Sequence, residues 1–268
     1  MIHYLVLLLY IGAFVLWLRT LVDGRSTGGP PAAPPVAVAG VVAHAVALAA
    51  YVASWGELPL VGLGPSLSSL SFIIGLGLVA SLAVGEAGRV GILLIPIMIL
   101  LEGSGLIIGV EPAPASLDFR GAWFALHVTL AFAGIGGMAL AAASGALYLA
   151  QHRELKSRRA GPVFQFLPPL ATLGRMSRVG AVAGFTTLTL ALALGWAWTV
   201  RFRHSFQGTD PKTIWSVFVW TVILATVLAQ RTGRGPERRG AVFSIVGFLL
   251  IVASYLVVRV AERGGLFL

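Results

Sequence analysis

The chain has 268 residues, of which 57% are hydrophobic and only 11% are charged, and its mean hydropathy is +0.91. Because a soluble domain carries about 25% charged residues, this composition excludes an ordinary soluble protein and predicts an all-α polytopic membrane helix bundle. The net charge of +9 is typical of basic loops beside a membrane and does not require nucleic acid as a partner. The absence of cysteine excludes disulfides and thiolate metal sites.

Apolar runs of about 17–25 residues are expected for spanning helices. The sequence contains eight of them, at residues 2–18, 36–54, 68–86, 90–108, 121–150, 179–200, 213–230 and 241–258. The fifth run is long and is expected to extend beyond the bilayer. The first run is unlike a signal peptide, because Arg19 and Arg25 follow it instead of preceding it. We therefore expect a single integral-membrane domain over residues 1–268, with N-terminal spans in 1–108.

The distribution of Lys and Arg predicts how the bundle is oriented. The loops that follow the first, third, fifth and seventh runs hold 13 of these residues, and the opposite side holds 6. Because basic residues stay on the cytoplasmic side, both termini and the 201–212 loop are predicted on the outer, periplasmic side of a bacterial inner membrane. The cytoplasmic segment 167–180 repeats an apolar residue at every third position, which predicts either a short interfacial helix or a plain connector.

Small residues recur in the fifth run at four-residue spacing, at Ala133, Gly137, Ala141 and Gly145. Side chains four apart lie on one face of a helix, and small ones allow a neighbouring helix to approach closely. We interpret this stripe as a structural contact and not as a chemical site.

Five histidines are candidates for chemistry. His3 and His152 lie at the ends of apolar runs and are interpreted as ordinary boundary residues. His44 lies eight residues into the second run, about 12 Å deep at 1.5 Å per residue. Ionisable groups at such depth usually face a partner or a cavity. The alternative is a neutral imidazole bonded to a backbone carbonyl of another helix.

Two further residues have open interpretations. His127 lies near the outer end of the fifth run, with Trp123 four residues earlier on the same helix face. This pair fits a flat aromatic ligand, and it equally fits an interfacial tryptophan beside a packed histidine. Glu102, in the outer half of the fourth run, could relay protons, balance a cationic ligand, reach the interface or pair with a polar neighbour.

The tryptophans are distributed unevenly. In the predicted topology only Trp17 falls in the inner half, and six fall in the outer half: Trp55, Trp123, Trp196, Trp198, Trp215 and Trp220. A plain aromatic belt would place tryptophan at both interfaces, so the asymmetry favours an outer aromatic surface. The pair Asp210-Pro211 has a structural explanation, because Asp caps helices and Pro is favoured at the first helical position.

Several segments resemble one family. The pattern D-P-K-x-x-W-S-x-x-x-W over 210–220 resembles the downstream half of the tryptophan-rich "WWD" signature of cytochrome c assembly proteins, the CcsA-like haem-handling membrane proteins. Residues 123–140 are similar to the family's span that opens with a haem-associated histidine, here His127. Residues 41–51, 66–72 and 90–100 resemble the HemX/YpjD-type branch, and the assembly-like region covers 121–260.

The resemblance implies haem, held non-covalently at the outer face. It implies His127 as an axial ligand of the haem iron, with His44 and His204 as further candidate ligands. The residues implied to surround the haem are Trp123, Trp196, Trp198, Asp210, Lys212, Trp215 and Trp220. The sequence departs from the family pattern in lacking a histidine after Trp220, a histidine after the last span and the W-x-W-D core.

The predicted function is binding and not catalysis, because no nucleophile–base pair, phosphate cradle or carboxylate cluster occurs. The chain is predicted to deliver haem at the outer face during cytochrome c biogenesis. The implied partners are haem, the lipid bilayer, and other cytochrome c assembly proteins or apocytochrome c. The alternative is a HemX-type accessory protein that regulates haem biosynthesis through cytoplasmic contacts of residues 151–178, with a degenerate haem site. A small-solute transporter ranks last, because no clear inverted repeat is visible.

Overall fold

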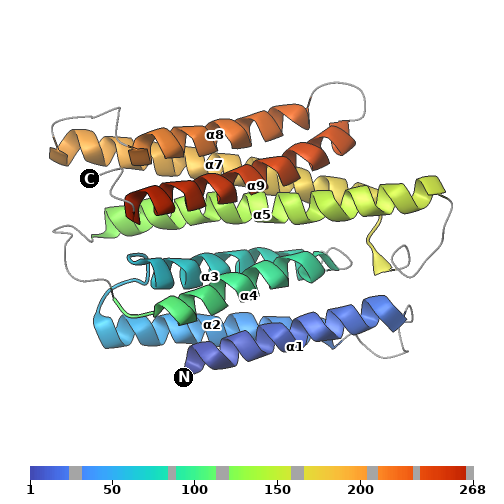
Figure 1. Ribbon diagram of the computed structural model, residues 1–268, viewed down its shortest axis with the longest axis horizontal. Helices are drawn as coiled ribbons and strands as arrows, with labels where there is room; N and C mark the ends of the chain where they lie inside the picture. The colour runs from blue at the N-terminus through green and yellow to red at the C-terminus, as the bar shows by residue number, and fades with distance from the viewer. Residues whose placement is uncertain are drawn as a thin grey trace. The chain divides into compact units, whose positions relative to one another are not determined.

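The protein is all-helical in its computed structural model, which confirms the predicted fold class (Figure 1). The structure describes residues 1–23, 32–83, 89–112, 121–157, 166–203, 211–231 and 236–263. The helices are α1 (Ile2–Asp23), α2 (Ala33–Trp55), α3 (Leu63–Leu82), α4 (Gly91–Ile108), α5 (Ala122–Ser157), α7 (Leu170–Arg203), α8 (Pro211–Ala229) and α9 (Pro236–Arg263). No strand occurs in these ranges.

The helices have the lengths that a bilayer demands. Within the described ranges, seven helices are long and apolar enough to cross a membrane, and α8 contributes a shorter apolar helix, Thr213–Ala229. All eight predicted apolar segments therefore correspond to helices, and seven of them meet the length and hydropathy expected of a membrane span. Helix α5 has 36 residues, about 54 Å at 1.5 Å per residue, which exceeds a hydrocarbon core of about 30 Å. Which ends of the helices face outward stays a prediction.

The segment 167–180 differs from both predictions made for it. Residues 170–180 are the first turns of the continuous helix α7, and Leu173 is fully buried. They are neither a separate interfacial helix nor a connector. The apolar residues at every third position reflect packing of the start of α7 and do not indicate a surface helix.

The chain divides into two compact units. Unit 1 comprises Met1–Gly121 and Leu147–Leu173, and unit 2 comprises Ala122–Ala146 and Gly174–Leu268. In unit 1, α1 packs against α2 and α4, and α3 packs against α2 and α4.

Local sequence accounts for the ends of α2. The helix begins with proline in its first turn, where the missing N–H costs nothing. It ends at Gly56, which adopts a φ of 68° and donates its N–H to the Val52 carbonyl. Glycine adopts this left-handed conformation without strain.

A contact between backbones brings α3 and α4 together in unit 1. A Cβ added to Gly105 would lie 3.0 Å from the carbonyl oxygen of Gly64, so the two helices meet without intervening side chains. Gly64 lies one turn before Ser68, and Gly105 lies nearly one turn after Glu102. The contact therefore places Ser68 and Glu102 on facing surfaces.

Unit 2 uses the predicted stripe of small residues. A Cβ on Gly137 of α5 would lie 2.7 Å from the carbonyl oxygen of Gly180 and 2.8 Å from the Cα of Gly184, both on α7. A Cβ on Gly145 would lie 2.9 Å from the carbonyl oxygen of Ala241 on α9. The close helix contact predicted for this stripe is confirmed. The apolar core of unit 2 is formed by Met138, Leu188, Val219, Ile223 and Ile251.

We predict that Gly137→Ala destabilises the protein, because the new methyl group meets backbone atoms that cannot rotate away. Overpacking of this kind costs about 1–3 kcal/mol, measurable as a lower midpoint of thermal or denaturant unfolding in detergent. Gly77→Ala is the matched control, since nothing lies within 4 Å of the added Cβ. Equal stability of the two variants would contradict the close contact of α5 and α7.

Candidate functional site

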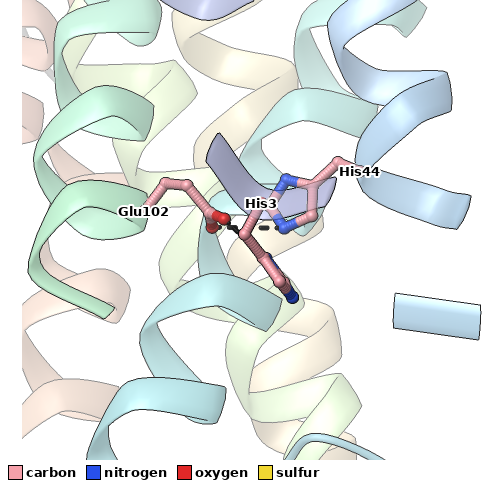
Figure 2. Close-up of side chains that lie close together, drawn as sticks. All are labelled: His3, His44 and Glu102. Carbon is pink, nitrogen blue, oxygen red and sulfur yellow. Dashed lines mark hydrogen bonds and ion pairs between the residues drawn. The ribbon is translucent and has the colours of Figure 1, made fainter. Parts of the chain in front are cut away.

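Two imidazoles and one carboxyl group converge inside unit 1 (Figure 2). His3 comes from α1, His44 from α2 and Glu102 from α4. The Nδ1 of His3 lies 2.7 Å from Oε1 of Glu102, and the Nε2 of His44 lies 3.3 Å from Oε2. We call these three residues the His–Glu cluster.

His44 is fully buried, and both of its ring nitrogens have hydroxyl partners. Nδ1 lies 2.9 Å from the Tyr10 hydroxyl, and Nε2 lies 2.9 Å from the Ser68 hydroxyl. The edge of the ring also meets Phe72, with centroids 5.5 Å apart. The prediction that His44 faces a partner is confirmed. The alternative of a bond to a backbone carbonyl is wrong, because side chains of α1 and α3 supply the contacts.

Glu102 pairs with polar neighbours, which was one of the open interpretations. Its side chain has no exposed surface, and its two oxygens face the two imidazoles of the cluster. The interpretation of His3 as an ordinary boundary residue is wrong, because its ring turns inward to Glu102. The predicted topology carried a signal for this pair, since it placed His3 and Glu102 in the outer half of their spans.

The cluster combines groups that carry out two kinds of chemistry. Imidazole and carboxyl groups at hydrogen-bond distance can share a proton. The same groups are also preferred ligands of divalent transition metals. Their burial among four packed helices fixes their mutual positions in either case.

We predict that Tyr10→Phe destabilises the protein by about 1–3 kcal/mol, because it leaves a buried ring nitrogen of His44 without its partner. Tyr4→Phe on the same helix removes an identical hydroxyl from a side chain that is 61% exposed, and it should change little. Thermal unfolding of both variants in detergent checks the difference. A Tyr10→Phe protein as stable as Tyr4→Phe would show that the hydroxyl contributes nothing to His44.

A second group of predicted site residues lies in unit 2, where α5 begins and α7 ends. His127 donates from Nδ1 to the Ala191 carbonyl at 2.7 Å, and Trp123 donates from Nε1 to the Leu194 carbonyl at 3.0 Å. The two donors are one turn apart on α5, and their acceptors are about one turn apart on α7. Both side chains are thus fixed against the same stretch of backbone.

Glycine at position 195 makes room for the His127 ring. A Cβ at this position would lie 2.8 Å from Cε1 of His127. Because Nδ1 holds the proton that it donates to Ala191, the neutral ring carries its lone pair on Nε2. A fixed tautomer with one available nitrogen is the usual state of a histidine that ligates a metal.

The tryptophans of unit 2 differ in their surroundings. Trp123 is 43% exposed and Trp196 is 61% exposed. Trp215 donates to the Ser254 hydroxyl, and Trp220 donates to the Thr189 hydroxyl. The indole of Trp215 therefore joins α8 to α9, and that of Trp220 joins α8 to α7. Trp123 and Trp196 present exposed aromatic surface.

Some predicted residues lie outside the described parts of the chain. His204 and Asp210 are among them, and of Lys212 the structure describes only the backbone, within α8. Trp198 is described in α7 and is half-buried. His152, interpreted as a boundary residue, stacks on Tyr148 with ring centroids 6.1 Å apart.

Comparison with known proteins identifies the family. The sequence pattern of the family described as "Cytochrome C assembly protein" matches residues 36–265. The chain belongs to the cytochrome c assembly protein family. The matched range includes both His44 and His127, and it confirms the resemblance seen in the sequence.

The known proteins that this chain resembles are distant in sequence. A protein of Azospirillum brasilense, named only as an uncharacterized 28.8 kDa protein, is 30% identical over 173 residues, which cover 63% of each chain. Protein HemX of Brevibacillus brevis is 28% identical over 130 residues, or 48% of each chain. The cytochrome c biogenesis protein CcsA of Prochlorococcus marinus (strain AS9601) is 23% identical over 75% of this chain and 72% of its own length. The chain thus spans less than two thirds of the first two relatives.

Proposed function

We propose that this protein serves cytochrome c biogenesis by holding haem non-covalently at the end of unit 2 formed by His127, Trp123 and Trp196. Membership of the cytochrome c assembly family supports the role in biogenesis. The geometry around His127 supports the place. Haem is the cargo, and the protein contributes an iron ligand and an aromatic surface.

The observation that carries the proposal is the fixed orientation of His127. Its Nδ1 donates to the Ala191 carbonyl, so Nε2 is the atom that would ligate the iron. A backbone acceptor of this kind holds the ring orientation and increases the basicity of the ligating nitrogen. The side chain is half-buried, which leaves it accessible to a ligand approaching from outside.

Exposed tryptophan beside this histidine fits the flat apolar faces of a porphyrin. Trp123 lies one turn from His127 on α5, and its indole N–H is already bonded to α7. The ring can therefore offer a face without leaving a polar group unpaired. Trp198, Trp215 and Trp220 remain proposed contacts, together with the sequence-based candidates Asp210 and Lys212.

The second axial ligand and the side of the membrane are parts of the same proposal. His204 lies between α7 and α8 in the sequence, within the predicted 201–212 loop, and is the candidate second ligand. The predicted topology places this loop outside, at the periplasmic face of a bacterial inner membrane, where haem would be passed to another assembly protein or to apocytochrome c. His44 lies in unit 1 and is proposed for a separate intramembrane site, not as a ligand at the haem contact formed by His127.

We predict that His127→Ala, made in the full chain and purified in detergent, lowers haem affinity by at least about 10-fold, because loss of even an outer partner of a metal ligand costs about 10–100-fold. The Soret absorbance and a haem assay on protein loaded with haemin measure the change. His152→Ala is the control, because it removes an imidazole that stacks on Tyr148 and should leave haem binding unchanged.

Two outcomes would contradict the proposal. One is a wild-type protein that takes up no haem, and the other is a His127→Ala protein that retains it fully. The first outcome would favour the alternative of a HemX-type accessory protein. In that case, partners captured through the basic segment 151–178 should persist when His127 and Trp215 are replaced.

We further predict that Gly195→Ala weakens haem binding while His127 is still present. The new methyl group would occupy space 2.8 Å from Cε1 of the imidazole and would turn the ring from its acceptor. A misplaced ligand should cost about 10-fold in affinity, with a shifted Soret maximum. Gly12→Ala, whose added Cβ has its nearest neighbour at 3.9 Å, controls for the substitution itself. Unchanged affinity and spectrum in Gly195→Ala would exclude the ring position as a determinant.

A further inference from the structure

The His–Glu cluster has the donor atoms of a metal site that the haem proposal does not use. One ligand atom from each of His3, His44 and Glu102 can be chosen so that all lie within 4.8 Å of one another. The cluster belongs to unit 1, whereas His127 belongs to unit 2. Its chemistry can therefore be examined separately from haem binding.

The spacing of these atoms suits a small divalent ion. Zinc binds imidazole nitrogen and carboxylate oxygen at about 2.0–2.1 Å in tetrahedral geometry, which separates neighbouring donors by about 3.3 Å. The observed separations are 2.7 Å from His3 Nδ1 to Glu102 Oε1 and 3.3 Å from His44 Nε2 to Glu102 Oε2. These two separations involve different oxygens of Glu102, and one donor atom from each of the three residues can be chosen so that all lie within 4.8 Å of one another.

The groups around the cluster support metal binding as well. The Nδ1 of His44 can donate its proton to the Tyr10 hydroxyl at 2.9 Å, which leaves the Nε2 lone pair directed toward Glu102. Such outer partners orient the imidazole ligands of metal sites. Ser68, 2.9 Å from Nε2, adds an oxygen at the same place and can serve as a ligand or hold a bound water.

The charge and the donor atoms of the site together favour one class of ion. Two neutral imidazoles and one carboxylate bring a charge of about −1, which a divalent cation converts to +1 within a low-dielectric span. Nitrogen-rich donor sets of this kind favour first-row transition metals over magnesium and calcium. His3 is 13% exposed and lies in the first turn of α1, so an ion can reach the cluster along the exposed part of this ring.

We propose that His3, His44 and Glu102 bind one divalent transition-metal ion, with Zn²⁺ as the probe and Tyr10 and Ser68 as supporting groups. The site is distinct from the proposed haem contact at His127. If the three residues formed only hydrogen bonds, the protein would hold no metal ion after desalting.

Metal binding can be measured on the full chain in detergent, carrying a C-terminal tag without histidine so that the tag adds no imidazole of its own. After treatment with EDTA, the protein is incubated with Zn²⁺ and desalted, and bound zinc is counted by mass spectrometry. We expect one ion per chain and a higher unfolding temperature when it is bound. Replacement by Co²⁺ should give the visible absorption of a four- or five-coordinate site.

Variants assign the ion to the cluster. Glu102→Gln and His44→Gln should each lower zinc affinity at least about 10-fold, and His152→Gln should not. Because a change at a buried position can impair folding, His3→Asn provides the second test. It alters a partly exposed residue in the first turn of α1 and should keep the elution volume and unfolding temperature of the metal-free wild type while losing the ion.

The outcomes are decisive in both directions. Absence of stoichiometric zinc on the wild type, or retention of zinc by folded His3→Asn and Glu102→Gln proteins, would overturn the proposal. His3→Asn should keep its haem, and His127→Ala should keep its zinc. Failure of the metal site is therefore distinguishable from failure of the haem site.

Discussion

A carboxyl group buried within an apolar helix is the constraint on which unit 1 depends. Insertion scales give a cost of about 2.5–3.5 kcal/mol for Arg, Lys or Asp at the centre of a spanning helix, and a carboxyl group in the predicted outer half of α4 still needs polar partners to offset its burial. Glu102 has such partners because α1 and α2 each place an imidazole beside one of its oxygens. The glycine contact between α3 and α4 is what lets Ser68 stand beside them. Polar contacts and close backbone packing are thus parts of one arrangement.

The polar side chains near the start of α5 in unit 2 are held in another way. His127 and Trp123 bond to carbonyl groups that already belong to the hydrogen-bonded ladder of α7. A carbonyl oxygen has two lone pairs and can accept a second donor without breaking the helix. The glycines that bring α5 against α7 keep this backbone within reach. The histidine is consequently held by main chain, and its remaining nitrogen is available for a ligand.

Much of the fold could be predicted because the bilayer restricts it. Length and hydropathy identify the spans, and the stripe through Gly137 identifies a helix contact. Residues 170–180 were misassigned, because a three-residue apolar spacing occurs equally in a surface helix and at a packed helix end. His3 was missed for a different reason. Its role depends on the packing of α1 against α4, and no local pattern around residue 3 encodes that contact.

For the candidate haem residues too, the sequence predicted some features, and others depended on tertiary packing. Depth in the span was sufficient to predict that His44 has a partner, but not that hydroxyl groups from α1 and α3 would provide it. The position of Trp123 one turn from His127 on α5 followed from helical spacing. Their acceptors on α7 lie more than 60 residues away in sequence, and only tertiary structure could identify them.

The order of the His–Glu cluster along the chain has a consequence for how the protein enters the membrane. Synthesis proceeds from the N-terminus, so His3, His44 and Ser68 are all made before Glu102. When α4 leaves the ribosome, the three helices that hold its polar partners have already been synthesised. The carboxyl group of Glu102 can therefore pair with residues that have already been synthesised, and it need not stay unpaired in lipid until a later helix is made.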